Sequence, residues 1–130
     1  MGDSCMTKEQ ALHKFWNSFG LSAYEETSTP DGMNRPSFPY MTYQLVTDAW
    51  GAEHQTAVNL WYRSESWVGV NAKKDEISAA IGEGGKIILC DGGYIWIKRG
   101  SPFAQNVREE SDDMVKRKYL NFAVEFLTAN

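Results

Sequence analysis

Apolar residues recur at three- and four-residue steps near the start of the chain. The stripe consists of Leu12, Phe15, Trp16 and Phe19. This spacing is typical of one face of an amphipathic helix. Thr7 and Gln10 have the spacing of a capping box at the helix start, and Gly20 suits a left-handed stop at its end. The pattern predicts a helix from Lys8 to Phe19.

A two-residue period follows, which is typical of half-buried strands. One face of the first run holds Met41, Tyr43 and Leu45; one face of the second holds Val58, Leu60 and Tyr62, opposite Asn59, Trp61 and Arg63. The two runs should be antiparallel neighbours, joined by a turn around Gly51. A shorter strand is expected within Leu21 to Thr27.

A second helix is expected after the polar break at Ser64 to Ser66, with Asn71 as its N-cap and Gly82 as its end. Its buried side would consist of Ile77, Ala80 and Ile81. Two strand-forming runs, Lys86 to Cys90 and Tyr94 to Lys98, then flank the turn Asp91-Gly92-Gly93, so they predict a hairpin. We expect this hairpin to place Ile87, Leu89, Ile95 and Ile97 in the core.

Two segments lack periodicity. Residues Thr29 to Pro39 contain three prolines and are expected to form a long loop that carries Met33 and Phe38 without a core to receive them. Residues Gly100 to Asp113 are polar, with an acidic tip, and are expected to form an exposed, mobile connection. A final strand should run from Leu120 to Leu127.

These elements predict an α+β fold in the order α-β-β-β-α-β-β-β, with two helices packed on an antiparallel or mixed sheet. The 130 residues are 42% hydrophobic, enough for one core, so residues 1–130 should form a single domain. No apolar run is long enough to span a membrane, and the N-terminus lacks the pattern of a signal peptide. We therefore expect no membrane partner and a cytoplasmic location.

Charge and motif spacing argue against several classes of function. The formal charge is -4 and no basic stripe is visible, which disfavours nucleic acid as a partner. Gly82, Gly84 and Gly85 follow a helix, so they are expected to end it and not to cradle phosphate.

Candidate chemistry is sparse. The chain lacks a Gly-x-Ser-x-Gly elbow, and its only histidines are His13 and His54. A metal site at His54 with Asp48 and Glu53 would require a tight turn, and the acidic run Glu109 to Asp113 lacks the spacing of a calcium loop. Cys5 and Cys90 are expected to be free thiols. We expect no catalytic centre, no metal and no cofactor.

Aromatic residues are more numerous than a core of this size requires. The side chains of Trp50, Trp61, Trp67 and Trp96 could line a groove that stacks on sugars or on nucleic-acid bases, but core or subunit contacts are the favoured interpretation. Trp61 is the clearest case because it falls on the polar face of its strand, beside Asn59 and Arg63. The chain thus looks like a protein that binds copies of itself and other proteins.

An ordered set of segments carries a resemblance to a known family. The set comprises the opening helix ending near Phe19, Phe38-Pro39-Tyr40-Met41-Thr42-Tyr43, the strand Gln55 to Tyr62, the second helix, Tyr94 to Arg99, and Lys116-Arg117-Lys118-Tyr119 leading into Leu120 to Leu127. In this order it resembles the tail terminators of long-tailed bacteriophages, of the minor tail protein U type, and related tail-completion and minor capsid proteins.

The resemblance implies a structural protein of a phage or prophage. Such a protein would form a ring, by analogy a hexamer, that caps the tail tube and joins it to the head, so its partners would be itself, the tube protein and connector proteins. The location would change from the host cytoplasm to the virion tail. The expected subunit contacts are Met33, Phe38, Trp61 and Trp67. Another neck or head–tail joining protein, or a small carbohydrate-binding module, remains an alternative.

Overall fold

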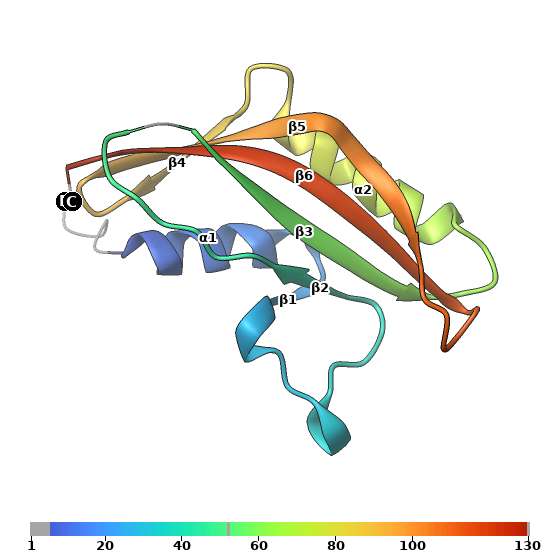
Figure 1. The fold of residues 1–130 in the computed structure, drawn as a ribbon. Helices are drawn as coiled ribbons and strands as arrows, with labels where there is room; N and C mark the ends of the chain where they lie inside the picture. Colours follow the sequence, from blue (N-terminus) through green and yellow to red (C-terminus); the bar gives the residue numbers. More distant parts are fainter. Residues whose placement is uncertain (1–5, 52, 130) are drawn as a thin grey trace.

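The protein forms an α+β fold with one mixed, curled sheet of six strands and two α-helices (Figure 1). The structure is a computed structural model, and it describes residues 6–51 and 53–129. Cys5, an expected free thiol, lies outside these residues. The elements are α1 (Lys8–Trp16), β1 (Ser22–Glu25), β2 (Tyr40–Tyr43), β3 (His54–Arg63), α2 (Val68–Ile81), β4 (Lys86–Cys90), β5 (Gly93–Arg108) and β6 (Val115–Thr128), with short 3-10 segments at Asn17–Phe19, Glu26–Ser28 and Gly32–Asn34.

The order of strands across the sheet is β1-β2-β3-β6-β5-β4. β1 and β2 are parallel, whereas all other neighbours are antiparallel. The expected antiparallel pairing of β2 with β3 is confirmed, with Met41 opposite Leu60. The parallel pair arises because the long segment between β1 and β2 brings the chain back to the end where β1 began, as a parallel connection requires.

The core lies between one face of the sheet and the two helices. Both helices contribute to a single cluster of buried side chains, so they cover the same face. Its largest fully buried members are Trp16, Met41, Val58, Leu60, Val70, Ile77, Ile81, Ile95, Ile97, Leu120, Phe122 and Phe126. Among the described residues, no helix is both long and apolar enough to cross a membrane.

Helix α1 lies where the two edges of the curled sheet approach each other. It contacts both edge strands, β1 and β4. Its start is the predicted capping box, in which Thr7 Oγ1 accepts from the Gln10 backbone N–H at 3.1 Å and Gln10 Oε1 accepts from Thr7 N–H at 3.0 Å. The α-helical part ends at Trp16 and a 3-10 turn continues to Phe19, where Gly20 takes the predicted left-handed conformation (φ 85°).

Helix α2 begins three residues before the predicted cap. Val68 is its first residue, so Asn71 is inside the helix and the predicted cap is wrong. The reason is local: Ser66 Oγ accepts from the Val68 backbone N–H at 3.3 Å, which supports an earlier start. Gly82 ends the helix as predicted. Ile77 and Ile81 are buried, but Ala80 is exposed because the buried stripe runs through Val70 instead.

The β4–β5 hairpin closes with Cys90 opposite Gly93, as predicted. Ile95 and Ile97 are fully buried, but Ile87 and Leu89 are 54% and 60% exposed, so their predicted place in the core is wrong. The physical reason is the position of β4 at the sheet edge: Ile88 and Cys90 turn toward the core, and the alternate residues turn to the opposite face.

The predicted mobile connection from Gly100 to Asp113 is mostly strand. β5 continues to Arg108 and pairs with β6 on both sides of an irregularity between Arg99 and Ala104. Pro102 is tolerated there because the ladder is interrupted at that point. β6 correspondingly begins at Val115, five residues before the predicted start. At the other end of the sheet, β2 stops at Tyr43, which leaves Leu45 38% exposed beyond the strand.

Candidate assembly surface

Residues 29–39, here called the arm, extend away from the body between β1 and β2 (Figure 1). A single 3-10 turn at Gly32–Asn34 is the only regular element within it, and Gly32 adopts a positive φ of 60°. Met33 is 102% exposed and Phe38 is 39% exposed. The predicted loop is therefore confirmed as a projecting segment that presents an apolar side chain to solvent.

An open cleft of about 990 Å³ lies beside the arm. Met33, Arg35 and Phe38 line one side, and Arg63 and Asp112 line the other. The Arg63 Nε donates to Asp112 Oδ2 at 3.1 Å, which ties the end of β3 to the turn before β6. The Met114 backbone N–H and then Arg63 hold the pKa of Asp112 below its ordinary value. The arm therefore forms one wall of the cleft, and the Arg63–Asp112 ion pair forms part of the other.

Behind the arm, aromatic rings cross the outer face of the sheet in a row. Phe38 lies 5.4 Å from Tyr40 by ring centroids, and Tyr40 stacks on Trp61 at 5.9 Å. The Arg117 guanidinium also lies over the Trp61 ring, 4.8 Å from its centroid. Tyr40, Trp61 and Arg117 are direct partners across β2, β3 and β6, so the sheet register itself produces the row.

Polar contacts hold this row in place. Trp61 Nε1–H donates to Thr42 Oγ1 at 2.9 Å. Arg117 Nε donates to Asn59 Oδ1 at 2.8 Å and its Nη1 pairs with Glu109 at 3.1 Å. Trp61 lies on the polar face, as the sequence predicted, but packing within the chain accounts for much of its surface.

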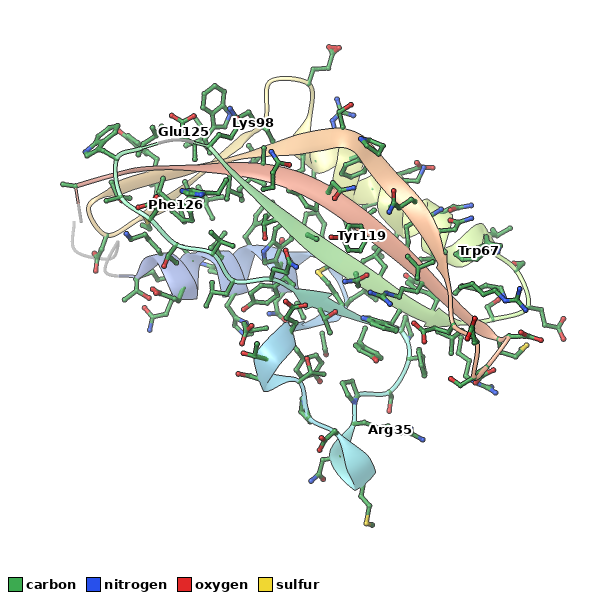
Figure 2. All side chains as sticks on the ribbon, viewed as in Figure 1. Arg35, Trp67, Lys98, Tyr119, Glu125 and Phe126 are labelled. Carbon is green, nitrogen blue, oxygen red and sulfur yellow. The ribbon has the colours of Figure 1, made fainter. Side chains whose placement is uncertain are left out.

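Trp67 occupies a separate region, immediately before α2 (Figure 2). Lys118 Nζ lies 5.4 Å and Lys116 Nζ 5.8 Å from the centroid of its ring. Lys118 is buried and donates to Asn106 Oδ1. Burial lowers the pKa of Lys118. The Trp67 ring thus packs over two lysines of β6.

The four predicted contact residues do not form one patch. Met33 and Phe38 line the same cleft, and Phe38 reaches Trp61 through Tyr40. Trp67 instead lines a small hollow with Arg108, Glu109 and Lys116. The structure therefore brings three of the four predicted residues into one continuous surface.

A second apolar surface, on β4 and β5, was not predicted from the sequence. Ile87 and Leu89 on β4 and Tyr94 on β5 are all largely exposed, and Leu89 is directly opposite Tyr94. The signal was the uninterrupted run Ile87-Ile88-Leu89, because consecutive apolar residues give a strand two apolar faces. Only one of these faces can contact the helices.

The remaining tryptophans differ in their surroundings. Trp96 Nε1 donates to the Gly84 carbonyl at 2.9 Å, and Lys98 Nζ lies 4.0 Å from its ring centroid. Lys98 also pairs with Glu53 and lies 3.7 Å from Glu125 (Figure 2). Trp50, by contrast, is 66% exposed. The described tryptophans do not gather around one groove.

The three side chains considered for a metal site, those of His54, Asp48 and Glu53, do not converge. His54 Nε2 meets Asp48 Oδ2 at 2.6 Å, whereas Glu53 turns to Lys98. The other histidine, His13, shares a hydrogen bond of 2.9 Å with Tyr43 Oη. Within residues 6–51 and 53–129, no three side chains of His, Cys, Asp or Glu are arranged to hold a metal ion.

Comparison of the chain with protein-family models, with curated proteins and with solved structures found no match.

Proposed function

We propose that the protein is a non-enzymatic assembly subunit of a phage or prophage tail, which forms a ring that caps the tail tube and joins it to the head. The observation that carries the proposal is the arm, with a fully exposed Met33 at its turn. The ordered segments that resemble tail terminators supply the particular role. Its partners would then be further copies of itself, the tube protein and the connector proteins.

Physical chemistry supports the assembly role. An apolar side chain on a projecting loop gains free energy when a partner covers it, roughly 2 kcal/mol for a methionine. The prolines at positions 30, 36 and 39 restrict the unbound arm, so less conformational entropy is lost when it docks. A ring repeats the same gain at every interface.

A carbohydrate-binding module is the weaker alternative. Sugar binding would use an aromatic ring with a free face in a cleft. Trp61 instead lies between Tyr40 and Arg117. Trp67 does line a small hollow, but Lys116 and Lys118 lie over its ring. Among the described residues that line the open cleft beside the arm, Phe38 has the only aromatic ring. A different neck or head–tail joining protein would share the fold and the arm, so the test must measure tube arrest directly.

The test replaces Met33 and Phe38 together by serine in the full chain. The variant should keep a thermal transition within a few degrees of the wild type, because Met33 is fully exposed and Phe38 lies outside the core cluster. It should neither form rings nor stop the growth of tail tubes. Val68→Ser is the matched control, since Val68 is 75% exposed on α2 and far from the arm in sequence. A double variant that still arrests tubes at normal length would refute the proposal.

A further inference from the structure

A groove of about 370 Å³ lies between α1 and the edge strand β4. Its floor and walls are mainly apolar, and its rim is formed by the exposed Lys14 of α1 and the exposed Ser18 of the 3-10 segment that follows. The apolar lining consists of Met6, Ala11, Phe15, Ile88 and Leu89. Leu89 borders the groove at the sheet edge and is 60% exposed.

The two edges of the sheet differ in how they are protected. At β1, the Asn17 side chain accepts from the Ala23 backbone N–H at 2.9 Å and donates to the Ala23 carbonyl at 3.3 Å. These bonds occupy the backbone groups that a further strand would need. No strand of the described residues covers the far side of β4, which carries the groove instead.

We propose that this groove receives the arm of a second copy of the chain, with Met33 inserted between α1 and β4. The proposal deepens the self-assembly proposed above, on which it rests. Met33 is 102% exposed, so no described residue covers it, and the groove offers apolar walls with room for one long, flexible side chain. Each copy thus carries an uncovered Met33 and an apolar recess that could receive it.

Charge complementarity favours the arm as the occupant. Asp31, two residues before Met33, and Lys14, on the groove rim, are both exposed. Within residues 6–51 and 53–129, neither of their side chains forms an ion pair. When Met33 enters the groove, Asp31 can approach Lys14.

The two surfaces lie on different parts of the chain. The arm follows β1 and leads into β2, whereas the groove borders β4 at the other end of the strand order. Contacts of this kind can repeat head-to-tail and close into a ring when the rotation permits, or two copies can exchange arms across a two-fold axis. The ring proposed above requires the head-to-tail arrangement.

The first experiment compares Leu89→Glu with Ile87→Glu in sedimentation velocity over a concentration series. Both residues are exposed on β4, so both variants should fold, but only Leu89 lines the groove. Leu89→Glu should weaken self-association by about tenfold or more, and Ile87→Glu should have little effect. Equal association of the two variants would overturn the proposal.

Charge exchange tests the orientation of the arm. Lys14→Glu and Asp31→Lys should each weaken association, because each places like charges together. The combination of both changes in one chain should restore it. Failure of the double variant to recover any association, with both single variants impaired, would show that these residues do not meet and would overturn the proposed docking.

Photo-crosslinking locates the contact. A photoreactive amino acid in place of Met33, in an isotope-labelled chain mixed with unlabelled chain, should crosslink between copies to peptides containing residues 11–18 or 86–90. Crosslinks confined to other segments, or a wild-type chain that remains monomeric at millimolar concentration, would overturn the docking. Groove crosslinks in a protein that does not arrest tail tubes would confirm the docking and refute the tail function.

Discussion

The rings of Tyr40 and Trp61 lie almost parallel, with 9° between their planes and 5.9 Å between their centroids. They are direct partners across β2 and β3, so the stack connects the short strand that follows the arm to the centre of the sheet. The Arg117 guanidinium on the far strand completes the stack. The base of the arm is thereby fastened to three strands, while its turn remains free.

Removal of this stack should destabilise the fold. Trp61→Ala deletes the contact with Tyr40, the cation–π contact with Arg117 and the hydrogen bond to Thr42, and we expect a loss of about 2 kcal/mol in the free energy of unfolding. Urea denaturation measures this change in the free energy of unfolding. Trp50→Ala, at a 66% exposed site, should change stability by no more than about 0.5 kcal/mol. Similar losses in the two variants would contradict the structural role of Trp61.

Asn17→Ala should open the protected edge of the sheet. The variant loses the two hydrogen bonds to Ala23 and the bond of 2.8 Å to the His13 carbonyl, so we expect a cost of about 1–2 kcal/mol. Faster hydrogen exchange at the Ala23 amide would report the lost acceptor directly. Asn34→Ala, in the exposed arm, is the control. An unchanged exchange rate at Ala23 would show that Asn17 does not seal β1.

Two glycines provide a paired test of backbone packing. At Gly93, where φ is 152°, an added Cβ would lie 2.0 Å from the Leu127 carbonyl oxygen of β6, so Gly93→Ala should cost roughly 3 kcal/mol or more. At Gly84 an added Cβ meets nothing within 4 Å. Gly84→Ala should be neutral or slightly stabilising. Thermal unfolding distinguishes the two, and a mild effect at Gly93 would argue against the close approach of the hairpin to β6.

Acid stability should depend on Asp48. The Ala49 backbone N–H and then His54 hold the pKa of Asp48 below its ordinary value of 3.8. A carboxyl whose pKa is lower in the folded state stabilises the fold at pH values above its unfolded pKa, and this contribution disappears as the pH falls through the folded value. Asp48→Asn should therefore reduce the melting temperature at pH about 6 and narrow its gap to the wild type below pH about 4.

Asp31→Asn is the control for this pH series, because the described structure gives the Asp31 side chain no ion pair. Its melting curve should follow that of the wild type throughout. A constant gap between Asp48→Asn and the wild type at all pH values would contradict the proposed linkage.

Local signals along the chain predicted those features that depend on neighbouring residues. The capping box at Thr7, the left-handed Gly20, the end of α2 at Gly82 and the hairpin at Asp91-Gly92-Gly93 all formed as expected. Each depends on hydrogen bonds or backbone angles within a few residues. Such features need no knowledge of which strands are neighbours.

The failures concern position within the sheet. Leu89 was expected in the core because it is apolar. Its apolar character does not indicate that β4 is an edge strand, one face of which is turned away from the helices. Residues 100–108 were expected to form a loop because they are polar. They belong to β5, which pairs with β6 on both sides of an irregularity between Arg99 and Ala104. Both cases depend on long-range pairing, which residue patterns specify only weakly.

The candidate assembly surface also combines features that nearby residues predict with features that depend on long-range pairing. Met33 and Phe38 could be identified because prolines and polar neighbours exclude them from regular structure. Trp61 could be assigned to the polar face from its period, but its stack with Tyr40 and Arg117 required the register of three strands. The groove at Leu89 was not predictable, since it is formed by α1 and β4, which are distant in sequence.

Helix α1 contacts both edge strands of the sheet, β1 and β4, so one helix packs against both edges. Detachment of nine helical residues, a far smaller event than global unfolding, would uncover the core-facing side of β4 at Ile88 and withdraw Asn17 from β1 at the same moment. Exposed apolar edges are where sheets join irreversibly into aggregates. We therefore expect the aggregation rate of the purified protein to follow how often α1 opens, and not the free energy of complete unfolding.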